Sequence, residues 1–164
     1  MNRRILLIVA LALPILVLGV DAFMHHLQRA NGEAVTLPIE GFDPRDLLSG
    51  HYLQYRVDYG VENGCDGYIG AASVCLRPTR GIYPRGDLPA DCGLFIQGHC
   101  DDHGIFLADI ERFYIPEEYA QSLEDKVRDH QGELALSVDR QGNAAIRDLL
   151  IDGKPWKEVA QTSH

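Results

Sequence analysis

The sequence has few positive charges and no cluster of lysine or arginine residues. It contains 15 Lys and Arg residues against 24 Asp and Glu residues, and the net charge is −9. Proteins that bind nucleic acid neutralise backbone phosphates with such clusters. We therefore expect no nucleic acid among the partners of this chain.

The sequence also lacks a complete catalytic constellation. It has five serines and three lysines, and no serine stands in a recognisable Ser-Lys peptidase context. Ser49 and His51 are close in sequence, but no third group is evident that would orient them. These absences favour a protein that is not an enzyme and that needs no cofactor. A cell-envelope hydrolase using Asp, Glu and His is the alternative.

What the sequence does contain is typical of one globular domain. Its 164 residues are 46% hydrophobic and 24% charged, which excludes a disordered or collagen-like chain. A length of this order corresponds to about one domain. No internal repeat and no second globular domain is evident.

The longest hydrophobic run lies at the N-terminus. Arg3 and Arg4 precede residues 5–20, none of which is charged. Continued to residue 24, the run reaches about twenty residues, the length that spans a hydrocarbon core. The two arginines should stay in the cytoplasm. We therefore expect residues 1–24 to form a transmembrane signal anchor, with the rest of the chain extracytoplasmic, in the periplasm.

The same segment also has a feature of cleaved signal peptides. Small residues lie at the first and third positions before a cut after Ala22. The apolar run exceeds the usual cleaved segment of about 7 to 15 residues, which favours retention. A cleaved and exported protein is the alternative. Residues 25–34 are polar and are expected to form a juxtamembrane stalk before a domain at 35–160.

Removal of the N-terminal segment leaves a strongly acidic domain. Residues 22–164 carry a net charge of −10, because Arg3, Arg4 and Asp21 are lost together. Anionic lipid headgroups should repel such a domain, so we expect it to contact the bilayer only through its anchor. A cationic partner is favoured electrostatically, although acidity also serves solubility.

Four cysteines lie within one 36-residue stretch: Cys65, Cys75, Cys92 and Cys100. An even number in an oxidising compartment indicates two disulfides. Four cysteines allow three pairings, and spacing does not select among them. Short loops favour Cys65 with Cys75 and Cys92 with Cys100. There is no C-x-x-C motif of the kind that thiol oxidoreductases use.

A metal site is a weaker alternative for the segment His99 to His103. His99, Cys100 and His103 offer ligand types that zinc or copper accepts. The spacing matches no standard zinc knuckle, and the two intervening acids equally suit a turn between strands. Free thiols would favour the metal site, and complete oxidation would remove its thiolate ligand.

Hydrophobic periodicity predicts an α+β fold with mainly antiparallel strands. Residues 51–59 alternate strictly between apolar and polar, which is typical of a half-buried strand. Further strands are expected at 35–39, 71–77, 93–97 and 104–114, the last with a bend near 109–112. Residues 133–138 and 144–151 should form a hairpin. One packed helix is expected over 116–128, with Tyr119, Leu123 and Val127 on its buried face.

Two segments resemble the bacterial GDYXXLXY protein family. The run from Gly41 to Val57 is similar to the signature segment: Gly50 and Tyr52 match, whereas His51, Tyr55 and Val57 replace other residues of the literal motif. The run from Ile110 to Glu117 is similar to a second family segment. The resemblance implies a membrane-anchored bacterial domain of uncharacterised function and transfers no catalytic residue.

The same two segments supply the candidate binding residues Arg45, His51, Glu111 and Arg112. They are polar side chains in or beside turns, where binding residues are frequent. A structural ion-pair cluster is the simpler interpretation of Arg45 and its acidic neighbours. The hypothesis that best joins anchor, disulfides and missing active site is an accessory or binding module for an integral membrane protein.

Overall fold

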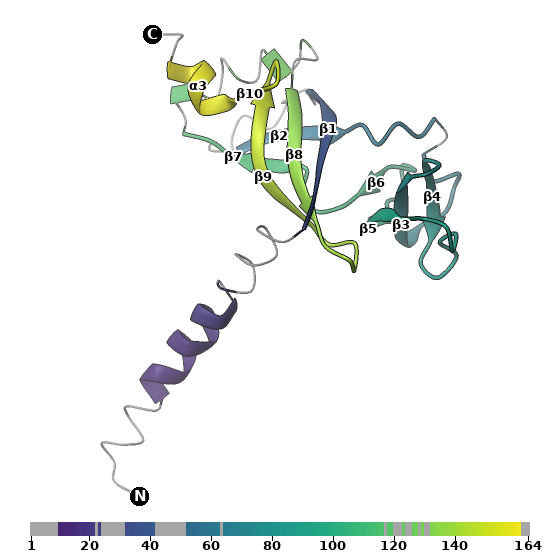
Figure 1. Ribbon diagram of the computed structural model, residues 1–164, viewed down its shortest axis with the longest axis horizontal. Coiled ribbons are helices and arrows are strands. Elements are labelled where there is room, and N and C mark those ends of the chain that lie inside the picture. Colours follow the sequence, from purple (N-terminus) through teal and green to yellow (C-terminus); the bar gives the residue numbers. More distant parts are fainter. Residues whose placement is uncertain are drawn as a thin grey trace, which may run out of the picture.

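The computed structural model describes residues 10–21, 23, 32–41, 52–62, 64–116, 118–119, 123, 126–127, 129 and 132–161. Residues 10–21 are helical and exposed, and Figure 1 shows this helix in purple, apart from the strands. Within the described residues, no helix has both the length and the apolar character needed to cross a membrane. Residues 1–9, 22 and 24 of the predicted anchor and residues 25–31 of the predicted stalk lie outside them.

The larger of two sheets has six antiparallel strands in the order β10-β9-β8-β1-β2-β7. Its strands are β1 (Glu33–Gly41), β2 (Tyr52–Val57), β7 (Arg112–Tyr114), β8 (Gly132–Val138), β9 (Ala144–Ile151) and β10 (Lys154–Pro155). Strand β1 pairs with β8 on one side and β2 on the other. The sheet therefore joins the beginning and the end of the domain.

Alternating side chains explain how this sheet forms its core. In β2 and the residue pair after it, Tyr55, Val57 and Tyr59 are buried, whereas Gln54, Arg56 and Asp58 are exposed. The predicted strand and the predicted buried face of this segment are thus confirmed for the described side chains. Leu37 and Ile39 of β1, Leu134 and Leu136 of β8, and Leu149 and Ile151 of β9 complete the buried layer.

Helical segments cover part of the large sheet. Residues 118–119, 123 and 126–127 are helical where the sequence predicted a helix over 116–128. Leu123 and Val127 are fully buried, and Tyr119 packs against the core, as predicted. The short helix α3 (Trp156–Gln161) follows β10 and was not predicted. Trp156 lies edge-on to Phe113 of β7 and to Tyr119, which ties α3 to both elements.

A smaller sheet is inserted between β2 and β7. Its four antiparallel strands are ordered β4-β3-β5-β6, with β3 (Gly70–Arg77), β4 (Gly81–Pro84), β5 (Leu94–Cys100) and β6 (Phe106–Leu107). In Figure 1 it is the teal group beside the large sheet. The expected bend before β7 is present, because Asp109 has a positive φ of 59°. The mainly antiparallel α+β fold is confirmed.

Two disulfides cross-link the smaller sheet, as the even cysteine count predicted. They join Cys65 to Cys100 and Cys75 to Cys92, with Cα separations of 5.9 and 6.0 Å. The pairing expected from short loops is wrong. Antiparallel pairing of β3 with β5 places Gly70 opposite Cys100 and Cys75 opposite Phe95. Early cysteines therefore meet late ones, and the two bridges are nested.

Contacts between polar groups connect the two sheets along a seam. The backbone N–H of Gln97 donates to the carbonyl of Gly142 at 2.8 Å, and its side chain donates to the carbonyl of Gln141. Arg77 of β3 forms an ion pair with Glu33 of β1. The small sheet is thus held against the large one at the end where β1 begins.

Candidate functional site

Of the four predicted binding residues, two can be placed. Arg45 and His51 lie outside the described residues. Glu111 lies just before β7 and is half-buried, and Arg112 is the exposed first residue of β7. Arg112 pairs with Gln54 across the ladder to β2. That these four residues together bind a partner therefore remains a prediction.

Glu111 has a clear structural task at the bend before β7. Its carboxylate accepts a hydrogen bond from the backbone N–H of Ala108 at 2.8 Å. Its own carbonyl accepts a hydrogen bond from the backbone N–H of Tyr55 at 3.2 Å. Between these contacts lies Asp109, whose positive φ marks the reversal. Glu111 therefore holds the turn that returns the chain from the small sheet to the large one.

Two buried tyrosines lie near Glu111 and differ in their hydrogen bonding. The Tyr55 hydroxyl donates to the carbonyl of Ile110 at 2.6 Å. The Tyr59 hydroxyl is buried with no partner among the described residues. Burial, and secondarily the negative charge of Glu111, raises the pKa of both phenols. Both hydroxyls therefore stay protonated over the physiological range.

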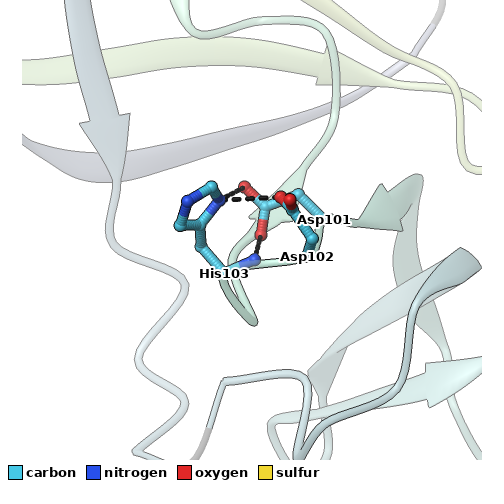
Figure 2. Close-up of side chains that lie close together, drawn as sticks. All are labelled: Asp101, Asp102 and His103. Carbon is cyan, nitrogen blue, oxygen red and sulfur yellow. Dashed lines mark hydrogen bonds and ion pairs between the residues drawn. The ribbon is translucent and has the colours of Figure 1, made fainter.

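The predicted turn between β5 and β6 is confirmed, and it contains a surface cluster of Asp101, Asp102 and His103 (Figure 2). The His103 Nδ1 atom lies 2.7 Å from a carboxylate oxygen of Asp102 and 3.8 Å from one of Asp101. The candidate ligand atoms of the three residues lie within 4.8 Å of one another. His103 and Asp102 are exposed at the tip of the loop.

The Asp101 carboxylate is already engaged by the loop itself. Its Oδ1 atom accepts hydrogen bonds from the backbone N–H groups of His103 at 2.9 Å and Ile105 at 2.8 Å. The bond from Ile105 is the main cause that lowers the pKa of Asp101. This carboxylate therefore serves as a loop cap.

The metal site that the sequence offered as a weaker alternative lacks its thiolate ligand. Cys100 is bonded to Cys65, so its sulfur is unavailable as a thiolate ligand. His99 lies exposed on β5, next to the disulfide. The remaining imidazole and carboxylate groups form an open surface cluster whose geometry is explained by the turn.

The seam between the sheets contains two hollows lined by described residues. One has a volume of about 540 Å³ and lies where the starts of β1 and β5 meet the β8–β9 loop; Glu33, Phe95 and Arg140 are among its lining residues. We call the other the seam cavity; its volume is about 260 Å³. It lies between β1 and β2 of the large sheet and β4 and the loop before β6 of the small one.

The seam cavity combines an apolar lining with a charged rim. Its apolar residues are Val57, Tyr59, Val61, Ile82, Ile105 and Phe106. Tyr59 and Phe106 form an edge-to-face pair with ring centroids 5.1 Å apart. Its charged residues, all exposed, are Glu40, Arg56, Asp58 and Glu62.

Comparison with known proteins identifies the family. The sequence model described as GDYXXLXY protein matches residues 14–149. The chain belongs to the GDYXXLXY family. No curated protein sequence and no solved structure matches it significantly.

The family segments of this GDYXXLXY protein are structural where they are described. The signature positions Tyr52, Tyr55 and Val57 lie in β2, and the second segment runs through β7. In that segment Phe113 packs on Trp156. The backbone carbonyls of Glu111 and Ile110 accept hydrogen bonds from the backbone N–H and the hydroxyl of Tyr55 in β2. The GDYXXLXY segments thus build one strand pair and the bend that leads into it.

Sequence reasoning missed the seam cavity completely. Its lining residues come from four separate stretches of the chain, residue 40, residues 56–64, residue 82 and residues 104–106, and no local spacing brings them together. The local signal was the pair of acids Asp58 and Glu62. Asp58 was interpreted only as a polar position of the predicted strand at 51–59. The sequence also did not predict that the buried Tyr59 hydroxyl has no hydrogen-bond partner among the described residues, because distant parts of the chain surround it.

Proposed function

We propose that this GDYXXLXY protein is a membrane-anchored extracytoplasmic module that binds an integral membrane protein and has no enzymatic activity of its own. The observation that carries the proposal is the pair of closed disulfides in the small sheet. Structural disulfides persist in oxidising compartments and are rare in a reducing cytoplasm. They support export of the part of the chain that contains them.

The charge pattern of the N-terminus supports the attachment. Arg3 and Arg4 precede an uncharged run through residue 20. In the proposal, residues 1–24 form the signal anchor with a cytoplasmic N-terminus, and residues 25–34 link it to the domain at 35–160. The positive-inside rule then fixes the direction.

A topology experiment tests the compartment. The full chain with a C-terminal tag is produced in a bacterial host that has a periplasm, and protease is added to intact spheroplasts. We expect digestion of the domain, retention of the tag-bearing chain in the membrane fraction before protease, and no alkylation of cysteines without reductant. A protected domain with reduced cysteines would contradict the proposal.

Charge variants of the N-terminus provide the matched control. Arg3→Glu combined with Arg4→Glu removes the positive charge that holds the N-terminus in the cytoplasm, so export should fall. Arg3→Lys combined with Arg4→Lys keeps the charge and should leave export unchanged. The intact mass of the membrane-extracted chain distinguishes a retained anchor from a cleaved signal peptide. Loss of the first 22 residues would contradict the anchor and indicate a cleaved, exported protein.

Partner binding needs its own test. Extraction in mild detergent followed by crosslinking should recover a defined integral membrane protein with the chain. Arg45→Ala and Arg112→Ala should reduce that recovery at unchanged protein level if the predicted binding residues contact the partner. Recovery of the chain alone under several crosslinking regimes would count against the accessory role.

A further inference from the structure

The seam cavity is too small for a whole drug-sized ligand. Sites for such ligands have volumes of about 300 to 1,000 Å³, whereas this cavity has about 260 Å³. Its size instead suits one side chain or a similarly small group.

The lining of the cavity indicates an aliphatic occupant. Val61, Ile82 and Ile105 are half-buried at its wall, so they present apolar surface that is only partly covered by the protein itself. Val57, Tyr59 and Phe106 also line the cavity and are buried. An unbranched hydrocarbon chain placed there would remove both its own apolar surface and that of the wall from water.

The rim indicates that this occupant ends in a positive charge. Glu40, Asp58 and Glu62 contribute three negative charges, and Arg56 contributes one positive charge. Arg56 lies opposite Glu40 in the β1–β2 ladder. Asp58 accepts a hydrogen bond from the backbone N–H of Gly60 at 2.7 Å. Glu62 is therefore the carboxylate whose charge is least committed to the described neighbours.

We propose that the seam cavity binds a lysine side chain of a partner protein. The four methylenes of lysine lie along the apolar wall while its ammonium group reaches the carboxylates at the rim, the arrangement that long basic side chains adopt at apolar surfaces. A compact ammonium with three donors suits separate carboxylates better than the planar guanidinium of arginine. The net charge of −10 on residues 22–164 attracts a basic segment from a distance.

This inference deepens the proposed function, on which it rests for the identity of the partner as a protein. The test uses the isotope-labelled full chain in nonionic detergent at neutral pH and low salt. The probe is N-acetyl-lysine methylamide, and N-acetyl-norleucine methylamide is its uncharged analogue. We expect saturable shifts in the NMR signals of Val61, Glu62 and Ile105 with the lysine probe, and much weaker shifts with norleucine.

Variants assign the effect to the rim. Glu62→Gln should weaken binding about two- to fivefold, the effect of losing one exposed ion pair, and adding Glu40→Gln should weaken it further. Glu62→Lys should abolish binding, because its own ammonium competes for the remaining carboxylates. Asp87→Asn is the matched control, because Asp87 is an exposed carboxylate outside the cavity, and it should leave binding unchanged.

Several results would overturn the inference. Equal binding of both probes would show a merely apolar hollow, and unchanged binding by the Glu40→Gln, Glu62→Gln double variant would place the cation elsewhere. Binding of 1,5-diaminopentane without binding of the lysine probe would assign the cavity to a free polyamine. No shifts with any probe would also overturn it. The titration is independent of compartment, so a failed topology experiment leaves its result readable.

Discussion

Asp101 and Asp139 hold two hairpin loops with the same set of hydrogen bonds. In each loop the Oδ1 atom of the aspartate accepts from the backbone N–H groups two and four residues later. Gly104 and Gly142 occupy the fourth position of the two loops, both with positive φ. The Asp101 cluster therefore has a counterpart without histidine, and its geometry follows from the requirements of the turn.

This equivalence predicts how the two loops respond to substitution. Asp101→Ala and Asp139→Ala should each lower the thermal unfolding midpoint, because two backbone N–H groups lose their acceptor in either case. Asp102→Asn is the control at the neighbouring carboxylate, which accepts no such backbone bond among those described. An equal loss of stability in Asp102→Asn would argue against the capping role of Asp101.

The lowered pKa of Asp101 adds a pH dependence. A carboxyl whose pKa is lower in the folded state binds fewer protons there than in the unfolded state, so it stabilises the fold above its unfolded pKa of about 3.9. That contribution is lost as the pH falls through the folded pKa. The stability difference between wild type and Asp101→Asn, measured in urea, should be present at pH 7 and shrink towards pH 3. A stability difference that stays constant from pH 7 to pH 3 would contradict this pH-dependent contribution of Asp101.

The two buried tyrosines should respond differently to loss of the hydroxyl. Tyr55→Phe leaves the Ile110 carbonyl without its donor and should lower the free energy of unfolding by about 1 to 3 kcal/mol. Tyr59→Phe removes a hydroxyl with no described partner and should be neutral or stabilising. Urea unfolding of both variants measures this contrast directly. The reverse order would place a strong acceptor beside Tyr59.

The raised pKa of both phenols predicts a loss of stability in alkali. The two protonated phenols contribute to the free energy of unfolding. This contribution is fully present below the pKa of tyrosine in the unfolded chain, about 10, and is lost as the pH rises above that value. The Tyr55→Phe, Tyr59→Phe double variant should therefore lose less stability between pH 9 and pH 11 than wild type, measured by urea unfolding at each pH. Parallel curves for the two proteins would contradict the assignment.

Gly98 is required by the close approach of β5 and β6. A Cβ atom at this position would collide with the Leu107 carbonyl and the Phe106 ring. Gly98→Ala should cost about 1 to 3 kcal/mol, as overpacking does in well-packed proteins. Gly93→Ala is the control, because nothing lies within 4 Å of the Cβ atom that it adds. Equal free energies of unfolding for the two variants in urea would show that β6 moves away from the added Cβ atom at little cost.

The nested disulfides predict unequal losses when each is removed. The bridge from Cys65 to Cys100 closes 35 residues and the bridge from Cys75 to Cys92 closes 17. Replacing either pair with alanine should cost about 2 to 5 kcal/mol. The longer loop should cost about 0.6 kcal/mol more, the entropy of a twofold difference in loop length. Unfolding of each paired variant under oxidising conditions measures the order, and mapping of unreduced peptides checks the pairing.

Local patterns predicted most of the large sheet. The alternation around Tyr55 marks its buried face within a single strand, and the hairpin of β8 and β9 is visible from two apolar runs around a glycine-containing turn. The same holds for the helical residues Leu123 and Val127, which repeat at helical spacing. In each case, the information lies within a few consecutive residues.

Features that depend on distant residues were beyond such patterns. The cysteine pairing follows from the register of β3 against β5, which loop length does not reveal. Strand β4 and helix α3 have four and six residues, too few for a period to emerge. The seam cavity exists only when both sheets are in place, so the candidate residues chosen from motifs did not include it.

The insertion of the small sheet between β2 and β7 has a consequence for the order of assembly. Every strand of the small sheet lies within residues 70–107, so all of its pairings are between nearby segments. The large sheet pairs β1 with β8 and closes only when the last third of the chain is present. Contacts between distant segments form more slowly than local ones. When the chain is extended from its N-terminus, the small sheet and its two disulfides can therefore form before β8 is present to pair with β1.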